Sequence, residues 1–146
     1  MLKEFFRENS QKSFRIWVEF WAMTQNMTLE PNKDKVIKLT KNSMLISSEV
    51  ISFEVGNALM NLHRKQKITE KEIFEAYRSY TLIPLRIITV DVENALKIAY
   101  KYKIYAYDAY YLEIADRLKM PLITFDVPMK RVAFDLKINI PEVMDK

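Results

Sequence analysis

YDAYYLEIADRLKMPLITFD, residues 107 to 126, is interpreted as a helix that leads directly into a short strand. The segment 107–120 is helical in this interpretation, and Pro121 separates it from the apolar run LITF. Each segment also carries an acid with apolar neighbours, because Asp108 lies between aromatic residues and Asp126 ends the strand. The stretch therefore predicts a helix–strand unit together with two candidate functional acids.

The rest of the chain alternates in the same way between short apolar runs and helical segments. MLIS (44–47) is a short apolar run, RIITV (86–90) is β-branched and strand-like, and INI (138–140) is a candidate edge strand. Strands separated by single helices predict an α/β fold whose parallel sheet is covered on both faces. In such sheets the functional crevice lies at the carboxyl ends of the strands. The helices are expected at residues 32–42, 48–67, 68–83, 91–104, 107–120 and 127–138.

Three of these helices begin with a recognisable signal. Thr69 and Glu72 have the spacing of a capping box, in which each residue hydrogen-bonds the backbone of the other. Asp91 is expected to be the N-cap of the next helix. Pro128 fits the first turn of the last helix, where a backbone N–H is not needed.

Composition narrows the class of protein and the chemistry open to it. A chain of 146 residues with 49% apolar residues suits one compact domain. The absence of cysteine excludes disulfides, zinc–thiolate sites and thiol nucleophiles. Gly56 is the single glycine, so neither a P-loop nor a GxGxxG turn can form. The single histidine, His63, is interpreted as a solvated residue near a helix end and not as part of a catalytic triad.

The sequence also gives an expectation for location and for the charge of a partner. No apolar run reaches the ~18 residues that a membrane span needs, and the first residues show no signal-peptide pattern. A cytoplasmic protein without a membrane partner is therefore the simplest expectation. A net charge of +4 and a pI of about 9.2 mildly favour an anionic partner.

Four of the 19 acids stand in apolar surroundings, namely Asp108, Asp126, Glu54 and Glu19. Each has a structural explanation of its own, such as a helix cap or a position beside the core. If the four converge, however, their mutual repulsion requires a compensating cation, and Mg²⁺ or Mn²⁺ suits ligands that are all carboxylates. Metals held in this way orient a water molecule and stabilise the oxygens of a phosphodiester during hydrolysis.

The same residues carry a resemblance to the PIN-domain family, and most of all to the toxin nucleases of VapBC toxin–antitoxin modules. Residues 54–59 match the family's E-x-x-N-A-L helix, and residues 107–115 match its Y-D-A-x-Y-x-x-x-A helix start. Residues 121–126 match its P-L-x-T-x-D strand. The resemblance covers residues 44–140 well, and the combination of motifs is specific although each motif alone is weak.

This resemblance implies a three-layer α/β/α PIN-like domain with a mostly parallel central sheet. It places a single domain at residues 13–146, after an N-terminal extension at residues 1–12. It also implies a Mg²⁺- or Mn²⁺-dependent endoribonuclease that is a homodimer and is blocked by a small VapB-like antitoxin. The implied site residues are Glu54, Asp108 and Asp126, which bind metal and act in catalysis, with Thr124 and Asn57 in support.

The beginning of the chain departs from the family pattern of an apolar strand, an Asp, and then small and hydroxylated residues. The best register places RIWVEFWAM (15–23) on that strand with Glu19 as a metal ligand, but Phe20 and Trp21 replace the small residues. A Glu carboxylate lies one bond, roughly 1.5 Å, further out than that of Asp. Because a displacement of ~1 Å in an active site can cost ~10²-fold in rate, weak activity is an alternative. In a second register residues 1–25 are helical and Glu19 faces solvent.

Basic and aromatic residues give weaker signals for nucleic acid. Arg64, Lys65, Lys130 and Arg131 are candidates for contacts with RNA phosphates, and the alternative is that they are solvated helix ends. The tyrosines of YKYKIYAYDAYY (100–111) invite a base-stacking interpretation. Packing at helix spacing, or at a dimer interface, is the preferred explanation for them.

Three functions are compatible with these observations. The first is the metal-dependent ribonuclease toxin. The second is a degenerate PIN-like domain that has weak or no nuclease activity and acts as a binding or dimerisation module. The third is another carboxylate–Mg²⁺ phosphohydrolase or a DNA nuclease.

Overall fold

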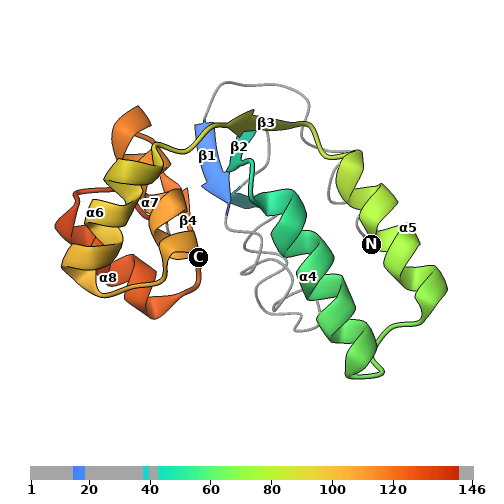
Figure 1. The fold of residues 1–146 in the computed structure, drawn as a ribbon. Coiled ribbons are helices and arrows are strands. Elements are labelled where there is room, and N and C mark those ends of the chain that lie inside the picture. Colours follow the sequence, from blue (N-terminus) through green and yellow to red (C-terminus); the bar gives the residue numbers. More distant parts are fainter. Residues whose placement is uncertain (1–14, 19–37, 40–42, 142–146) are drawn as a thin grey trace.

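The computed structural model describes residues 15–18, 38, 39 and 43–141, and its centre is a four-stranded sheet (Figure 1). The strands lie in the order β3-β2-β1-β4, and each pair of neighbours is parallel, as predicted. The strands are β1 (Arg15–Val18), β2 (Met44–Ser48), β3 (Leu85–Ile88) and β4 (Leu122–Ile123).

The strand β1 decides between the two registers for the beginning of the chain. It pairs with β2 from Arg15 to Trp17 and with β4 from Trp17 to Val18, so it lies inside the sheet. The strand interpretation is therefore confirmed for residues 15–18, and the helical alternative is wrong for them. Glu19 follows β1 in the sequence but lies outside the described residues, as do Phe20, Trp21 and the predicted extension at residues 1–12.

Five helices cover the sheet in the described part of the chain. Alternation along β2 explains how two faces are covered, because successive side chains of a strand point to opposite sides. Leu45 joins an apolar cluster with α4 and α5, whereas Ile46 joins a second cluster with α6, α7 and α8. The strand β4 alternates in the same way, with Leu122 in the second cluster and Ile123 in the first. The helices are α4 (Ile51–Arg64), α5 (Glu70–Thr81), α6 (Val92–Tyr102), α7 (Ala106–Leu118) and α8 (Val127–Asp135).

The predicted three-layer α/β/α architecture is thus confirmed, and Figure 1 shows α4 and α5 on one side of the sheet and α6, α7 and α8 on the other. One expectation needs correction, because helices do not separate the strands singly. Two helices, α4 and α5, connect β2 to β3, and another two, α6 and α7, connect β3 to β4. Within the described residues, no helix has the length and apolar character needed to cross a membrane.

The predicted helix starts at Thr69, Asp91 and Pro128 are all confirmed. The Thr69 hydroxyl accepts a hydrogen bond from the Glu72 N–H, and the Glu72 carboxylate accepts one from the Thr69 N–H at 2.7 Å. Asp91 caps α6 by accepting from the Asn94 N–H at 3.1 Å. Pro128 lies in the first turn of α8. These caps satisfy backbone donors that have no partner within the helix.

Two predicted elements differ from the structure. Residues 138–140 form no strand in the described part of the chain, although the Asn139 carbonyl accepts one hydrogen bond from the Leu122 N–H at 2.9 Å. A single bond beside β4 does not make a strand, so the predicted edge strand is wrong. Of the helix predicted at 32–42, only residues 38 and 39 are described as helical, and the rest lies outside the described residues.

Candidate metal and catalytic site

Three of the predicted site acids lie at the beginnings of helices. Glu54 is in the first turn of α4, which follows β2, and Asp126 is the N-cap of α8, which follows β4. Asp108 is in the first turn of α7. The positive end of a helix dipole favours a carboxylate at each of these positions. Because β2 and β4 run parallel in one sheet, Glu54 and Asp126 both follow the carboxyl edge, where such folds place their functional crevice.

Glu54 is half-buried and receives a hydrogen bond from the hydroxyl of Tyr111, a fully buried residue of α7. Burial raises the pKa of Glu54 to about 7; the Tyr111 hydrogen bond opposes this rise, and the charge of Asp108 adds to it. Because α4 and α7 belong to different helical layers, the contact between Glu54 and Tyr111 joins the two layers beyond the end of the sheet.

Asp108 links the other two acids. Burial raises the pKa of the Asp108 carboxyl above its usual range, and the neighbouring charge of Asp126 raises it further. Asp108 in turn raises the pKa of Glu54. The three acids therefore form a series of repelling neighbours, in which Asp108 is the shared member. The structure brings Asp108 within electrostatic range of both Glu54 and Asp126, and the roles of the three acids in metal binding and catalysis stay predictions.

The structural explanation for Asp126 also holds. Its Oδ1 accepts a hydrogen bond from the Met129 N–H at 2.7 Å, which caps α8. The buried Thr124 supports this turn, because its hydroxyl accepts a hydrogen bond from the Asp126 N–H at 3.1 Å. A carboxylate has two oxygens and several acceptor positions, so capping through one oxygen is compatible with a second role for Asp126.

These acids fit a divalent metal by the chemistry of their donors. Hard cations such as Mg²⁺ prefer oxygen ligands, and Mg²⁺ is usually held by one or two carboxylates together with waters. Each of the pairs Glu54–Asp108 and Asp108–Asp126 carries a repulsion that a cation would relieve. Among the residues that the structure describes, no three acids or histidines are grouped closely enough to hold one ion between them. The fit therefore rests on pairs of carboxylates.

Asn57 and the predicted phosphate-binding residues lie at different distances from these acids. Asn57 is exposed and one turn after Glu54, so it shares that side of α4. Arg64 and Lys65 end the same helix, and at 1.5 Å per residue they lie roughly 15 Å further along it. Arg64 and Lys65 are therefore not close to the acids, as a contact with a phosphate beside the cleaved bond would require.

The residues of α8 are better placed. Lys130 and Arg131 are exposed, and the Lys130 N–H donates to the Asp126 carbonyl within the first turn of the helix. His63 is near a helix end, as predicted, but it is half-buried, and its Nδ1 forms a 2.9 Å hydrogen bond with the Ile68 carbonyl. The predicted solvated histidine is thus a structural residue of the turn between α4 and α5. That turn also carries a surface hollow of about 600 Å³, which lies at the end of α4 away from Glu54.

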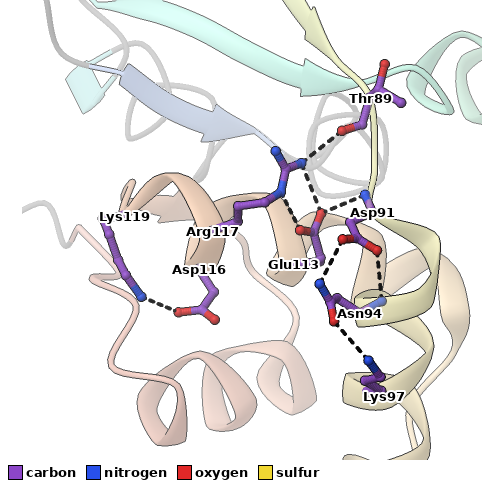
Figure 2. A network of polar contacts seen from close by, with 8 residues as sticks. All are labelled: Thr89, Asp91, Asn94, Lys97, Glu113, Asp116, Arg117 and Lys119. Carbon is purple, nitrogen blue, oxygen red and sulfur yellow. Dashed lines mark hydrogen bonds and ion pairs between the residues drawn. The ribbon is translucent and has the colours of Figure 1, made fainter.

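One buried acid, Glu113 of α7, was not recognised from the sequence. Its carboxylate accepts from the Arg117 side chain at 2.5 and 3.2 Å and from the Asp91 N–H at 3.2 Å (Figure 2). Arg117 also donates to the Thr89 carbonyl at 2.9 Å. This network fixes the segment between β3 and α6 against α7. The i, i+4 spacing of Glu113 and Arg117 in an apolar stretch was the available signal.

Replacing Glu113 by Ala is expected to lower the free energy of unfolding by about 2 kcal/mol, because removing one partner of a buried pair leaves the charge of the other without a partner. The loss is moderated because the Arg117 side chain is 39% exposed and can regain water. Urea denaturation followed by circular dichroism measures the change. The control is Glu93→Ala, which breaks an exposed pair with Lys97 and should cost under ~0.5 kcal/mol. Equal losses in the two variants would contradict the structural role of Glu113.

The fold and the acids together define a class of protein, an α/β/α domain with carboxylates gathered where the strands end. The family model for the PIN domain matches residues 20–135, which is most of the chain, and the chain belongs to the PIN-domain family. The match includes Glu54, Asp108 and Asp126. The PIN domain is a nuclease fold, and its nucleases typically use divalent metals.

Two solved structures share this fold. PAE2754 from Pyrobaculum aerophilum has a TM-score of 0.62 and 19% sequence identity, over 83% of this chain and 87% of that one. A toxin–antitoxin complex from Klebsiella pneumoniae has a TM-score of 0.52 and 15% identity, over 76% of this chain and 86% of that one. No significant match was found among curated proteins. At these identities the likeness concerns the fold alone.

Proposed function

We propose that this PIN domain is an endoribonuclease of the VapC toxin type that uses Mg²⁺ or Mn²⁺ to hydrolyse RNA phosphodiesters in the cytoplasm. The observation that carries the proposal is the series of acids at the beginnings of three helices, in which Asp108 repels both Glu54 and Asp126. Repelling carboxylates destabilise a fold unless a cation joins them, so their presence favours a metal-dependent function over a purely structural one.

In this proposal the pairs Glu54–Asp108 and Asp108–Asp126 hold metal, which would polarise a phosphate oxygen and activate water. Asp108 is the shared ligand because it neighbours both other acids. Asp126 helps to orient the attacking water, and Thr124 keeps the Asp126 backbone in place. Lys130 and Arg131 lie close to Asp126 along α8 and would attract the phosphates that flank the cleaved bond.

Glu19 is proposed as a further metal ligand. It is the residue that follows β1 in the sequence, and β1 pairs with both β2 and β4. The helix after β2 carries Glu54 in its first turn, and the helix after β4 has Asp126 as its N-cap. This order along the sheet supports the register in which Glu19 replaces the family's first Asp.

Replacing Tyr111 by Phe is expected to weaken Mn²⁺ binding about 10- to 100-fold, because Tyr111 orients a proposed ligand, the Glu54 carboxylate, through its hydroxyl. The ring remains to fill the core. Electron paramagnetic resonance of free Mn²⁺ during titration gives the affinity without any need for activity. Tyr80→Phe is the matched control, because it removes another buried hydroxyl, which contacts Ser52 at 3.1 Å. Unchanged Mn²⁺ affinity in Tyr111→Phe would refute this role.

The proposed partners are a small VapB-like antitoxin and a second copy of the chain. The fold shared with the Klebsiella pneumoniae toxin–antitoxin complex supports a search for an antitoxin. A neighbouring gene that encodes a small DNA-binding protein would be the simplest sign of it. Co-expression of the two genes, followed by co-purification of their products, tests the pairing directly.

Cleavage of a panel of substrates tests the activity. The purified chain is incubated with single-stranded RNA, double-stranded RNA and DNA, each with Mn²⁺ or with a chelator. We expect cleavage of single-stranded RNA that the chelator abolishes. Cleavage of DNA alone would instead favour the third function named above.

A second candidate function is a degenerate PIN-like domain that acts as a binding or dimerisation module. It is favoured by the bulky Phe20 and Trp21 beside Glu19 in the sequence and by the lack of a three-acid cluster among the described residues. A crystal soaked in Mn²⁺ that shows no metal at Glu54, Asp108 and Asp126, together with inactivity on every substrate of the panel, would support it.

A further inference from the structure

The corner where α6 passes into α7 exposes an unusual set of side chains. Residues 97–107, here called the α6–α7 corner, contain three lysines, four tyrosines and no acid. Tyr100 is 89% exposed, Tyr105 is 84% exposed and Tyr107 is 51% exposed. Large aromatic side chains gain most of their stabilising free energy from burial, so three that remain in water are available for a partner.

The exposure corrects one half of the preferred explanation for these tyrosines, packing at helix spacing, and leaves the other half, a dimer interface, a prediction. Tyr102, Tyr110 and Tyr111 pack in or against the apolar cluster, as packing at helix spacing requires. Tyr100 and Tyr105 do not, since most of their surface is exposed. The tyrosine-rich stretch thus divides into members that stabilise the fold and members that face outward at the corner.

The backbone brings the exposed tyrosines to one bend that ends at the site. Lys103 terminates α6 in a left-handed conformation, and the Ile104 N–H donates back to the Ala99 carbonyl at 3.2 Å. The chain therefore turns sharply between Tyr100 and Tyr105, and Tyr105 is the N-cap of α7. Tyr107 is the residue directly before Asp108.

The charge of the corner is positive. Glu93, one turn before it on α6, is engaged by Lys97 at 2.8 Å. Lys101 lies 5.0 Å above the ring of Tyr102, and both Lys101 and Lys103 are exposed. In the described part of the chain, neither of these two lysines takes part in an ion pair with an acid. Their charge is therefore available to an anionic partner.

We propose that the α6–α7 corner binds single-stranded RNA and leads it to the acids. Bases stack on Tyr100, Tyr105 and Tyr107, and the phosphates between them lie near Lys101 and Lys103. Exposed aromatic rings alternating with cations are what a single strand requires, because every base has a face to stack and every nucleotide carries a charge. A protein partner would account for the tyrosines, which are enriched in protein interfaces, but not for the lysines, which are depleted in them. The choice of RNA as the ligand rests on the proposed function.

Fluorescence anisotropy with a labelled, unstructured oligoribonucleotide of about 12 nucleotides tests the proposal. The full chain is used with a chelator, so that binding is measured without cleavage. Tyr100→Ala and Tyr105→Ala are each expected to weaken binding about 5- to 100-fold, as the loss of one stacked base would. Tyr77→Ala is the matched control, because Tyr77 is 41% exposed on α5 in the other helical layer. It should leave the affinity unchanged.

The salt dependence gives a second readout. Replacing Lys101 or Lys103 by Gln should reduce the slope of log affinity against log salt by about 0.7 each, the value for one phosphate contact on a single strand. Lys71→Gln, which alters an exposed ion pair on α5, is the control.

Each outcome separates this proposal from the proposed nuclease. Weakened binding in the tyrosine variants supports the RNA surface even if no substrate is cleaved, in which case only the nuclease fails. Unchanged affinity in both tyrosine variants overturns the surface, whether or not the protein cleaves RNA. If Tyr100→Ala instead converts a dimer to a monomer in light scattering and leaves RNA affinity unchanged, the corner belongs to a second copy. Val92 and Leu96, which are about half exposed on α6, provide apolar surface that such a dimer would bury.

Discussion

Asp108→Asn is expected to reduce Mn²⁺-dependent cleavage of single-stranded RNA by at least ~10²-fold. Asp108 neighbours both other acids, so its loss removes the proposed ligand that they share. Losing a group that only supports a metal ligand costs ~10- to 100-fold, and losing the ligand itself should cost more. The substitution keeps the size of the side chain and removes its charge, so packing in the first turn of α7 is retained.

The expected loss is distinguishable from unfolding. Because Asp108 is repelled by its neighbours, Asp108→Asn should leave thermal stability unchanged or raise it in the metal-free protein. Asp116→Asn is the matched control on the same helix, where Asp116 contacts Lys119 at 2.9 Å away from the other acids. Full activity in Asp108→Asn would remove Asp108 from the mechanism, and equal losses in both variants would make the effect non-specific.

Glu54→Gln is expected to stabilise the metal-free protein at pH 8 by about 2 kcal/mol, equivalent to a rise of roughly 6 °C in Tm. In the folded protein burial raises the pKa of Glu54 from 4.5 to about 7, so the folded state binds a proton that the unfolded state has released. Stability therefore falls as the pH rises from about 4.5 to 7, and the loss is complete above pH 7. Gln carries no charge and removes this dependence.

Adding a metal ion is expected to reverse the difference in stability between Glu54→Gln and the unmodified protein. At pH 8, Mn²⁺ should raise the Tm of the unmodified protein, because an ion that binds only the folded state stabilises it by mass action. Glu54→Gln should lose most of that response together with its RNA cleavage. Thermal melts from pH 5 to 8, with and without Mn²⁺, give both results. Glu75→Gln, at an exposed pair with Lys71 on α5, should follow the unmodified protein throughout. A Glu54→Gln variant that is less stable than the unmodified protein at pH 8 would refute the assigned environment of Glu54.

Local signals in the sequence predicted most of the fold. Thr69 with Glu72 and Asp91 predicted helix starts correctly because a cap depends on a few adjacent residues. The short apolar runs predicted β2, β3 and β4 at the right places, whereas β1 was predicted by placing RIWVEFWAM on the first strand of the family pattern. The predicted edge strand at 138–140 failed because strand formation needs a neighbour, and only one hydrogen bond joins this segment to β4.

The acids of the candidate site could be predicted from the sequence, but the residues that contact them could not. Asp108 and Asp126 stood out through apolar neighbours in the sequence, and their electrostatic coupling agrees with the expected convergence. The contact between Tyr111 and Glu54 spans 57 residues, so no local pattern could reveal it. Glu113 was missed because its partners, the backbone of Asp91 and the side chain of Arg117, are recognisable only after α6 and α7 have packed together.

The position of β1 has a consequence for the order in which the chain can fold. Among the strands that the structure describes, β4 neighbours β1 alone, and the pairing of Val18 with Ile123 closes a loop of roughly a hundred residues. The strands β2 and β3, with α4 and α5 between them, form a unit with much shorter closure. During synthesis the segment that becomes β1 emerges before β2, β3 and β4, yet its second edge stays unpaired until β4 has also been made. Distant pairings of this kind slow folding, so the attachment of β4, which leads into Asp126, is expected to be a late step.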